Sequence, residues 1–380
     1  MQGEITIRPE EENKLLEKLK ERKDAEAARM LRFLGMPDLS RTAGSPIYEL
    51  VQRIRGAKDF EDFAIVEVPE IVPADQSFDL FDFPADHPAR SKSDTYYVDE
   101  ENILRTHTTV SWYYYLTSDY AKKKIEANED LGVLTYGKVY RKDEIDRNHM
   151  NVFHQIDGYY LIPKDKGVIV IEDLKKVLAD IAQTVFGKDV EYRFNEDTFP
   201  YTHPSTEMEV RIGGKWIEIL GSGVVKGSVL EKLGVDSKNY TGWAFGFGLE
   251  RLAIVGMELP DIRLLWSEDE RVKKQLKLGN KYEEVSKYPP VVRDISFIVD
   301  KSFVPNNYFD LIRDIGGDMI EEVELLDHYD NDAKFGADKT SYTYRILYRS
   351  MDRTLTADEV GPIHAKIEEE TRKQFGGEIR

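Results

Sequence analysis

Two stretches of this sequence carry an arginine in a setting that suits a polyphosphate. In the first, Arg141 and Asp143 follow a predicted strand, and Phe153 opens the strand that returns after a loop. A guanidinium donates two parallel charge-assisted hydrogen bonds to a phosphate. Arg141 and Phe153 would thus present a fork and a ring to one ligand. By itself, an arginine followed by an acid is more often a surface ion pair.

The second stretch, residues 246–252, is a glycine-rich turn that enters a predicted helix. Gly246 and Gly248 allow close approach of the backbone. Arg251 adds a positive charge to the first helical turn, beside the positive end of the helix dipole. In isolation the pattern is better explained as a plain turn before a helix. The two stretches together favour a site for a polyphosphate.

Both stretches lie within residues 45–278, whose mixture of strand-like, helix-like and loop-like segments predicts an α+β catalytic domain. Strands rich in Val, Ile and Tyr, such as 133–140 and 168–171, alternate with loops that contain Pro and Gly. Helices are predicted at 111–128 and 172–186. Before this domain, the spacing of apolar residues over 10–34 predicts one amphipathic helix within an N-terminal extension, residues 1–44.

A linker is predicted at 279–287, and residues 288–380 form a separate domain. Its pattern is strand, helix, strand, strand, helix and short tail, at 291–299, 306–315, 320–329, 341–348, 357–375 and 376–380. This order predicts a ferredoxin-like fold. In the third strand, Tyr342, Tyr344 and Tyr348 alternate with Arg345, and Arg349 follows on the arginine side. One side would pack on the helices and the other would meet a partner.

Composition limits the function. The 380 residues have a formal net charge of −18, so binding to nucleic acid must be local rather than indiscriminate. The absence of cysteine excludes disulfides and thiolate metal sites. No apolar run is long enough for a membrane span, and the N-terminus shows no targeting pattern. We expect a cytoplasmic protein without a membrane partner, with the mitochondrial matrix after removal of a presequence as the alternative.

The two arginine stretches resemble the second and third signature motifs of class II aminoacyl-tRNA synthetases. Further blocks resemble phenylalanyl-tRNA synthetase of the single-chain kind, and they lie at 78–90 (FDLFDFPADHPAR), 104–109 (LRTHTT), 199–205 (FPYTHPS), 216–223 (WIEILGSG) and 243–246 (WAFG). Residues 288–297 (YPPVVRDISF) and 349–355 (RSMDRTL) resemble the anticodon-binding domain of that family. The fold class implied is a class II antiparallel-sheet core followed by a ferredoxin-like anticodon-binding domain.

The resemblance implies a monomeric phenylalanine-tRNA ligase that uses ATP and Mg²⁺ to form phenylalanyl-adenylate and then charges tRNA(Phe). Arg141 would bind the α-phosphate and the amino-acid carboxylate, Arg251 the distal phosphates, and Phe153 the adenine. Asp143 and Glu218 would lie at the nucleotide, with Glu218 also at the metal. The residues implied for phenylalanine are His107, Thr109, Val110, Ser111, Trp112, Asn148, His149, Met150, Gln155, Ile156, Asp157, Phe199, Tyr201, Ala244 and Phe245, and those for tRNA are Arg345 and Arg349.

Four residues depart from the family pattern. Many bacterial and mitochondrial members carry Phe, Ser, Gln and Glu where this chain carries Tyr201, Thr109, Trp112 and Asp157. Aspartate is one methylene shorter than glutamate, so its contact with a substrate ammonium group would be lost or relayed by water. Trp112 and Asp157 leave open a paralogue that activates a different amino acid. A third alternative is a catalytically silent tRNA-binding protein, against which the intact Arg141, Phe153, Glu218 and Arg251 speak.

Overall fold

The computed structural model describes residues 4–284, 288–350 and 353–380, so parts of the predicted linker and of the block at 349–355 lie outside the described residues. The chain forms two compact units. The first comprises the residues up to Arg141, together with Val152–Leu259 and Leu276–Lys281. The second comprises Lys142–Asn151, Pro260–Gln275 and Tyr282–Arg380. Two segments of the predicted catalytic domain, Lys142–Asn151 and Pro260–Gln275, thus pack with the C-terminal part of the chain.

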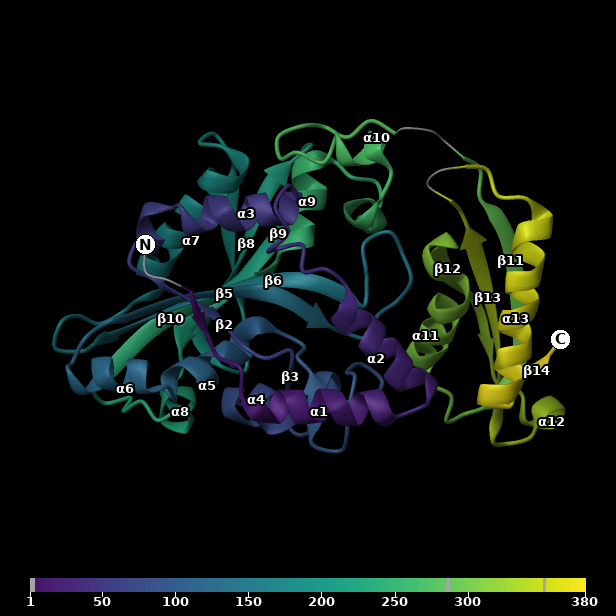
Figure 1. Cartoon of the computed structure of the whole chain (residues 1–380), viewed down its shortest axis with the longest axis horizontal. Coiled ribbons are helices and arrows are strands. Elements are labelled where there is room, and N and C mark those ends of the chain that lie inside the picture. The colour runs from purple at the N-terminus through teal and green to yellow at the C-terminus, as the bar shows by residue number, and fades with distance from the viewer. Residues whose placement is uncertain (1–3, 285–287, 351–352) are drawn as a thin grey trace. The chain divides into compact units, whose positions relative to one another are not determined.

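The first unit is built on one eight-stranded sheet (Figure 1), ordered β1-β2-β5-β6-β10-β9-β8-β7. Its strands are β1 (Ile5–Thr6), β2 (Ala64–Glu67), β5 (Leu131–Tyr140), β6 (Val152–Pro163), β7 (Tyr192–Asp197), β8 (Thr202–Ile212), β9 (Lys215–Val225) and β10 (Tyr240–Gly248). The pairs β1–β2 and β2–β5 are parallel, and every other pair is antiparallel. This agrees with the antiparallel core that the resemblance implies.

Helices cover both faces of this sheet. They are α1 (Glu10–Glu21), α2 (Ala25–Gly35), α3 (Pro46–Arg55), α4 (Ala74–Phe78), α5 (Ser111–Leu116), α6 (Asp119–Glu126), α7 (Ile171–Phe186), α8 (Gly227–Lys232) and α9 (Leu249–Met257). A short ladder joins β3 (Ile71–Pro73) to β4 (Asn102–Leu104). Short 3-10 helices lie at Lys58–Phe60, Asp79–Phe81, Pro88–Arg90 and Thr108–Val110.

The two faces of the sheet are named here by their helices. The α7 face is covered by α3, α7 and α9. On the opposite face, the α5 face, Trp112 of α5 packs in one core with Tyr159 of β6 and Ala244 of β10. Residues directly opposite in neighbouring strands share a face. Asp157 lies opposite Thr135 and Gly246, and its spacing of two from Tyr159 places it on the α5 face.

Two helix predictions were wrong in the same way. The single helix expected over 10–34 is two helices, because the Asp24 side chain accepts a hydrogen bond from the Ala27 N–H (2.9 Å) and begins α2. Likewise the helix expected over 111–128 is interrupted where the Ser118 hydroxyl caps α6. Such caps compete with continuation of the preceding helix. The strand expected at 168–171 is also absent, and Val168 and Val170 are exposed.

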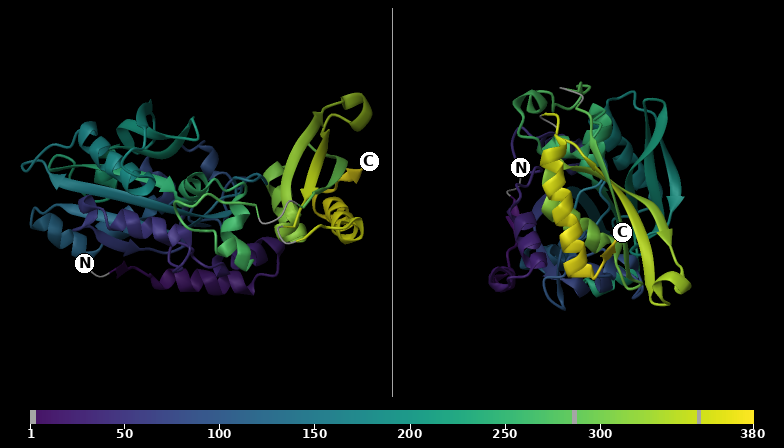
Figure 2. Two further views of the ribbon diagram at one scale, coloured as in Figure 1. Left: turned by 90° about the horizontal axis from the view of Figure 1, so that it is seen from above. Right: turned by 90° about the vertical axis from the view of Figure 1, so that its right-hand side faces the viewer.

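The second unit contains a four-stranded antiparallel sheet ordered β12-β13-β11-β14, with α13 lying along its strands (Figure 2). Its elements are α10 (Glu270–Lys273), β11 (Val291–Asp300), α11 (Pro305–Gly316), β12 (Ile320–Tyr329), α12 (Asp332–Phe335), β13 (Lys339–Tyr348), α13 (Ala357–Phe375) and β14 (Glu378–Ile379), with 3-10 helices at Ile262–Trp266 and Gly317–Met319. The predicted order of strands and helices is confirmed.

The core of the second unit lies between its sheet and the helices α11 and α13. Tyr344 and Tyr348 of β13 are buried there, and the Tyr344 ring packs at a tilt against Tyr308 of α11 with ring centroids 5.5 Å apart. Ile145 belongs to the same core although it comes from the segment Lys142–Asn151. Its carbonyl accepts a hydrogen bond from the Val323 N–H at 3.0 Å, so the segment is bound to β12 through both side chain and backbone.

Candidate active site

The phosphate-binding candidates gather at one end of the sheet in the first unit. Strand β6 is antiparallel to both β5 and β10, so the end of β5, the start of β6 and the end of β10 lie together. Arg141 follows β5, Phe153 is the second residue of β6, and Arg251 lies in the first turn of α9, which follows β10. The fold therefore brings Arg251 to the same edge as Arg141 and Phe153, about a hundred positions earlier in the sequence.

Arg141 and Phe153 interact directly. The guanidinium carbon of Arg141 is 5.2 Å from the centroid of the Phe153 ring, a distance typical of a cation–π contact. The Arg141 Nε donates to the carbonyl of Thr106 at 3.0 Å. The arginine is exposed, so its side chain is accessible from solvent.

Arg251 lies beside Glu218 of β9. Its Nη1 is 3.4 Å from the Glu218 carbonyl and 3.8 Å from the carboxylate, and both side chains are about half exposed. A β-bulge orients Glu218: Met208 pairs with Leu220 but Glu209 pairs with Glu218, which leaves Ile219 as an extra residue. Because a bulge reverses the alternation that follows it, Glu218 points to the α5 face, as Asp157 does.

Asp157 is the buried carboxylate of the site, with 5% of its surface exposed. The Thr108 hydroxyl donates to its Oδ2, and the Thr109 hydroxyl donates to its Oδ1 at 3.2 Å. Opposite it, a β-carbon on Gly246 would lie 2.3 Å from Oδ1, so glycine is required there to make room for the carboxylate. Next to it, Gln155 accepts a hydrogen bond from the Thr108 N–H at 3.2 Å.

Burial shifts the titration of two side chains here. Removal from water raises the pKa of Asp157 to about 6, although the hydroxyls of Thr108 and Thr109 oppose the shift. Burial, together with the charge of Arg141, lowers the pKa of His107 to about 3. His107 is therefore neutral near pH 7, while Asp157 is poised to accept a positive charge.

Aromatic rings surround this carboxylate on the α5 face. Trp112 lies 4.9 Å from Tyr159 and 6.3 Å from Tyr201, and Tyr201 is stacked on Phe199 at 6.2 Å between ring centroids. The ring of Phe199 occupies the space where a β-carbon of Gly221 would stand. We call the residues Phe81, Phe83, His107, Trp112, Tyr159, Phe199 and Tyr201 the aromatic cluster.

Several residues around Asp157 were not proposed individually from the sequence. Phe81 and Phe83 lie in a block that resembles the family, yet only the structure shows that both rings contact His107 and Tyr201. Thr108 was missed as well, although it donates to the same carboxylate as Thr109. Their spacing gave no usable signal, because Phe81 ends a short 3-10 helix and Phe83 follows it in a loop.

Polar atoms at the edge of the cluster lack partners among the described residues. They include Nε1 of Trp112, Nδ1 of His107, Oγ of Ser111 and the hydroxyl of Tyr159, all buried. A buried polar atom without a partner is unfavourable unless a ligand or water satisfies it. Val110 is fully buried and contributes only apolar packing.

Two proposed substrate residues of the first unit lie on the other face of its sheet, and four further proposed substrate or ATP residues belong to the second unit. Ile156 and Phe245 point to the α7 face, because each is one residue removed from Asp157 or from its partner Gly246. Asp143, Asn148, His149 and Met150 belong to the segment that packs in the second unit. There His149 and Asp146 form a 2.8 Å pair, and this hydrogen bond raises the pKa of the imidazole.

No group of three or more His, Asp or Glu side chains that could hold a metal is found over the described ranges. Glu218 is a single exposed carboxylate, with Glu209 opposite it on β8. Mg²⁺ keeps several waters and uses one or two carboxylates plus substrate phosphates. Glu218 fits that mode of binding and does not fit a cage formed by protein ligands alone.

The two arginines proposed for tRNA both meet carboxylates in the second unit. Arg345 forms a bidentate pair with Asp294 of β11, with both nitrogen–oxygen distances 2.9 Å. Arg349 lies 2.7 Å from Glu321, which is 2% exposed and also contacts Arg147 at 2.6 Å. Arg345 is therefore the more accessible of the two.

Comparison with known proteins agrees with this geometry. Residues 34–276 match the family model described as tRNA synthetases class II core domain (F), and residues 286–380 match the ferredoxin-fold anticodon binding domain. Phenylalanine--tRNA ligase, chloroplastic/mitochondrial, of Arabidopsis thaliana is 40% identical over 84% of this chain and 73% of the relative. The mitochondrial phenylalanine--tRNA ligase of Mus musculus is 37% identical over 83% and 74%.

A third relative matches only the first part of the chain. The phenylalanine--tRNA ligase alpha subunit of Caldicellulosiruptor bescii is 40% identical over 57% of this chain and 63% of the relative. The chain belongs to the phenylalanine-tRNA ligase family of class II tRNA synthetases, whose single-chain members it matches over most of its length. The resemblance and the fold class expected from the sequence are thus confirmed.

The single-chain relatives are named as mitochondrial or chloroplastic enzymes, which does not support the expectation of a cytoplasmic protein. No helix in the described parts of the chain is long and apolar enough to cross a bilayer.

Proposed function

We propose that this chain is a phenylalanine-tRNA ligase that activates phenylalanine with ATP and transfers it to tRNA(Phe). One observation carries the proposal: Arg141 with Phe153, and Arg251 with Glu218, occupy one end of the sheet whose α5 face holds Asp157 and the aromatic cluster. A cationic edge beside a buried carboxylate suits a nucleotide and an amino acid held side by side.

In the first reaction, the carboxylate oxygen of phenylalanine attacks the α-phosphorus of ATP, and pyrophosphate leaves. Arg141 would bind both the α-phosphate and the attacking carboxylate, which aligns them and neutralises the charge that develops. Arg251 would hold the departing phosphates. Phe153 would stack on adenine, and the cation–π contact with Arg141 supports its position. Catalysis is then positioning and charge stabilisation, without a covalent enzyme intermediate.

For the amino acid, Asp157 would hold the ammonium group, with Gln155, Thr109 and His107 around it. Phe199 and Tyr201 would meet the benzyl ring, since offset and edge-to-face contacts suit aromatic partners. Ala244 of the same core would lie beneath the ring, and Trp112 would border the site. Glu218 would share a Mg²⁺ with the phosphates, where the metal would neutralise their charge.

The second unit would recognise the anticodon, with Arg345 and Arg349 as candidate contacts to the RNA backbone. We propose a monomer, because the catalytic motifs and the anticodon-binding domain lie on one chain and the single-chain relatives share this arrangement. The names of those relatives favour the mitochondrial matrix as its compartment. As functional regions we propose an N-terminal extension (1–44), a catalytic domain (45–278), a linker (279–287) and an anticodon-binding domain (288–380).

Pyrophosphate exchange that depends on the amino acid tests this function. Phenylalanine should support exchange more strongly than tyrosine or other amino acids, and the product should be transferred to tRNA(Phe). Exchange with a different amino acid alone would instead identify a paralogue, for which Trp112 and Asp157 supply the reason. Absence of exchange with every amino acid would favour a silent tRNA-binding protein.

A further inference from the structure

His154 is a buried residue that no proposed role uses, although it directly follows Phe153. It is 0% exposed and lies on the α7 face, behind the strand edge that carries the Phe153 ring. Its Nδ1 is 2.6 Å from Oε1 of Glu250, and its Nε2 accepts a hydrogen bond from the Leu39 N–H at 2.9 Å. Because a backbone N–H can only donate, Nε2 carries no proton, and Nδ1–H donates to Glu250.

Glu250 holds the backbone of the same residue as well as its side chain. The His154 N–H donates to both carboxylate oxygens, at 2.8 and 3.0 Å. Glu250 is 3% exposed and lies in the first turn of α9, immediately before Arg251. His154 follows Phe153, the candidate for adenine, and Glu250 precedes Arg251, the candidate for the distal phosphates. The contacts between His154 and Glu250 therefore connect the two parts of the proposed ATP site.

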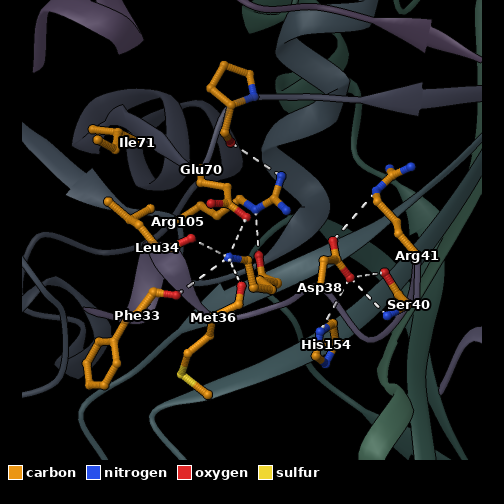
Figure 3. Close-up of polar contacts among 12 residues, drawn as sticks. Phe33, Leu34, Met36, Asp38, Ser40, Arg41, Glu70, Ile71, Arg105 and His154 are labelled. Carbon is orange, nitrogen blue, oxygen red and sulfur yellow. Dashed lines mark hydrogen bonds and ion pairs between the residues drawn. The ribbon is translucent and has the colours of Figure 1, made fainter. Parts of the chain in front are cut away.

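The other nitrogen of His154 is fixed by the segment that follows α2. Figure 3 shows His154 beside Asp38, whose Oδ1 lies 3.4 Å from Nε2. That oxygen also accepts a hydrogen bond from the Ser40 N–H at 2.9 Å, while Arg41 lies 3.6 Å from Oδ2. These contacts hold the Leu39 N–H toward the imidazole and so select the tautomer that donates to Glu250.

We propose that His154 and Glu250 are positioning residues for ATP: they hold the Phe153 ring and the Arg251 guanidinium at the separation that one nucleotide requires. The Leu39 N–H contributes by fixing the imidazole in the donating tautomer. Neither residue touches the substrate, since both lie on the α7 face. The inference rests on the proposed ATP site, and it adds a link between strand β6 and helix α9 that sets the affinity for the nucleotide.

Two variants of one residue separate the two ends of this link. In His154→Asn, the amide nitrogen lies near the former Nδ1, so the donor to Glu250 is kept while the acceptor for Leu39 is lost. In His154→Gln, the amide oxygen lies near the former Nε2, so the acceptor for Leu39 is kept while the donor to Glu250 is lost. Both variants remove one buried hydrogen bond and an imidazole, so they are matched for general destabilisation.

The expected result is a difference between the variants in ATP affinity, not in stability. His154→Gln should raise the ATP KM in pyrophosphate exchange roughly 10- to 100-fold, the scale on which small misplacements act, and leave the phenylalanine KM near that of the unchanged protein. His154→Asn should stay within about 3-fold for ATP. Glu250→Gln, which keeps one acceptor oxygen, should fall between them.

Dissociation constants for ATP, measured by calorimetry on the same full-length proteins, separate failure of this inference from failure of the function. The inference is overturned if both His154 variants change ATP affinity equally, or if only their melting temperatures change. If the unchanged protein binds ATP but shows no exchange, the proposed function fails. The dissociation constants of the two His154 variants for ATP still test the inference in that case. Absence of ATP binding by the unchanged protein would overturn both.

Discussion

At the scale of the residue, Asp157 is held at the expense of stability. Its pKa is about 6 in the folded chain, against an ordinary value of 3.8, because burial disfavours the charged form. A carboxyl whose folded pKa is raised stabilises the fold at low pH, and this contribution is lost as the pH rises from about 4 to about 6. At pH 7 the penalty is up to about 3 kcal/mol.

Asp157→Asn should therefore be more stable than the unchanged protein at pH 7, by roughly 1 to 3 kcal/mol, because the buried charge is removed. The gain should vanish below about pH 4, where both side chains are neutral. Urea denaturation at the two pH values measures this difference. Equal or lower stability of the variant at pH 7 would show that the carboxylate is not held in an unfavourable state.

The same titration should appear in substrate binding. An ammonium group needs the charged carboxylate, so the KM for phenylalanine should rise as the pH falls through about 6, by up to about tenfold per pH unit below it. His107, with a pKa near 3, stays neutral over this range and does not contribute. Exchange assays from pH 5 to pH 8 test this, and Asp157→Asn should have a high KM that no longer follows this titration.

Arg141→Ala should lower the rate of pyrophosphate exchange by at least roughly 100- to 1,000-fold, since a positioned cation in the transition state is lost. The side chain is exposed, so the melting temperature should hardly change. Arg141→Lys keeps the charge but not the fork and should recover only part of the rate. Near-normal exchange by the alanine variant would remove Arg141 from its proposed role.

At the scale of the element, Gly246 on β10 makes room for Asp157 on β6. In Gly246→Ala, the new β-carbon would lie 2.3 Å from the Asp157 carboxylate, which must then shift. The KM for phenylalanine should rise roughly tenfold or more, with a smaller effect on the ATP KM. Gly248→Ala is a matched control for the phenylalanine KM alone, because nothing lies within 4 Å of its β-carbon and it leaves the Asp157 carboxylate in place. Similar kinetics for both variants would argue against this role of Gly246.

How far the sequence predicts these elements depends on the range of the forces that set them. Alternation in β13 correctly assigned Tyr344 and Tyr348 to the core and Arg345 to the other side, because period two follows from strand geometry alone. The breaks at Asp24 and Ser118 were missed, since both are single side-chain caps within otherwise helical patterns. One capping residue is difficult to recognise when the apolar residues on both sides of it keep helical spacing.

The site was predicted unevenly for a similar reason. Arg141, Phe153, Glu218 and Arg251 were proposed through resemblance, and strand order gives the physical reason why they meet at one edge. The orientation of Glu218 depends on a bulge that no local pattern indicates. Phe245 was proposed as part of the floor, yet alternation relative to Gly246 sends it to the α7 face. Faces can be assigned only when the register between strands is known.

At the scale of the whole molecule, an acidic chain must bind an acidic polymer. The net charge of −18 gives no general attraction, so individual cations carry the contact. Arg345→Ala should raise the KM for tRNA in the charging reaction, by roughly threefold to tenfold for one lost phosphate contact, and leave pyrophosphate exchange unchanged. Asp294→Ala is the converse test, because removal of its bidentate partner frees Arg345 and should lower that KM. Equal effects on charging and exchange would contradict a role in tRNA recognition.

The second unit includes two segments from within the predicted catalytic domain, Lys142–Asn151 and Pro260–Gln275, and this affects how it can be studied in isolation. Ile145 fills part of the core around Tyr344, and Arg147 is paired with the buried Glu321, although both residues precede β12 by well over a hundred positions in the sequence. Arg263 likewise donates to the Ile320 carbonyl at 2.7 Å. A protein fragment of residues 288–380 would therefore lack Ile145 from its hydrophobic core. Its buried Glu321 would also lose Arg147, one of the two arginines that pair with it. Such a fragment should be expressed together with peptides that supply Lys142–Asn151 and Pro260–Gln275. Otherwise, point variants of the intact chain are the better experiment.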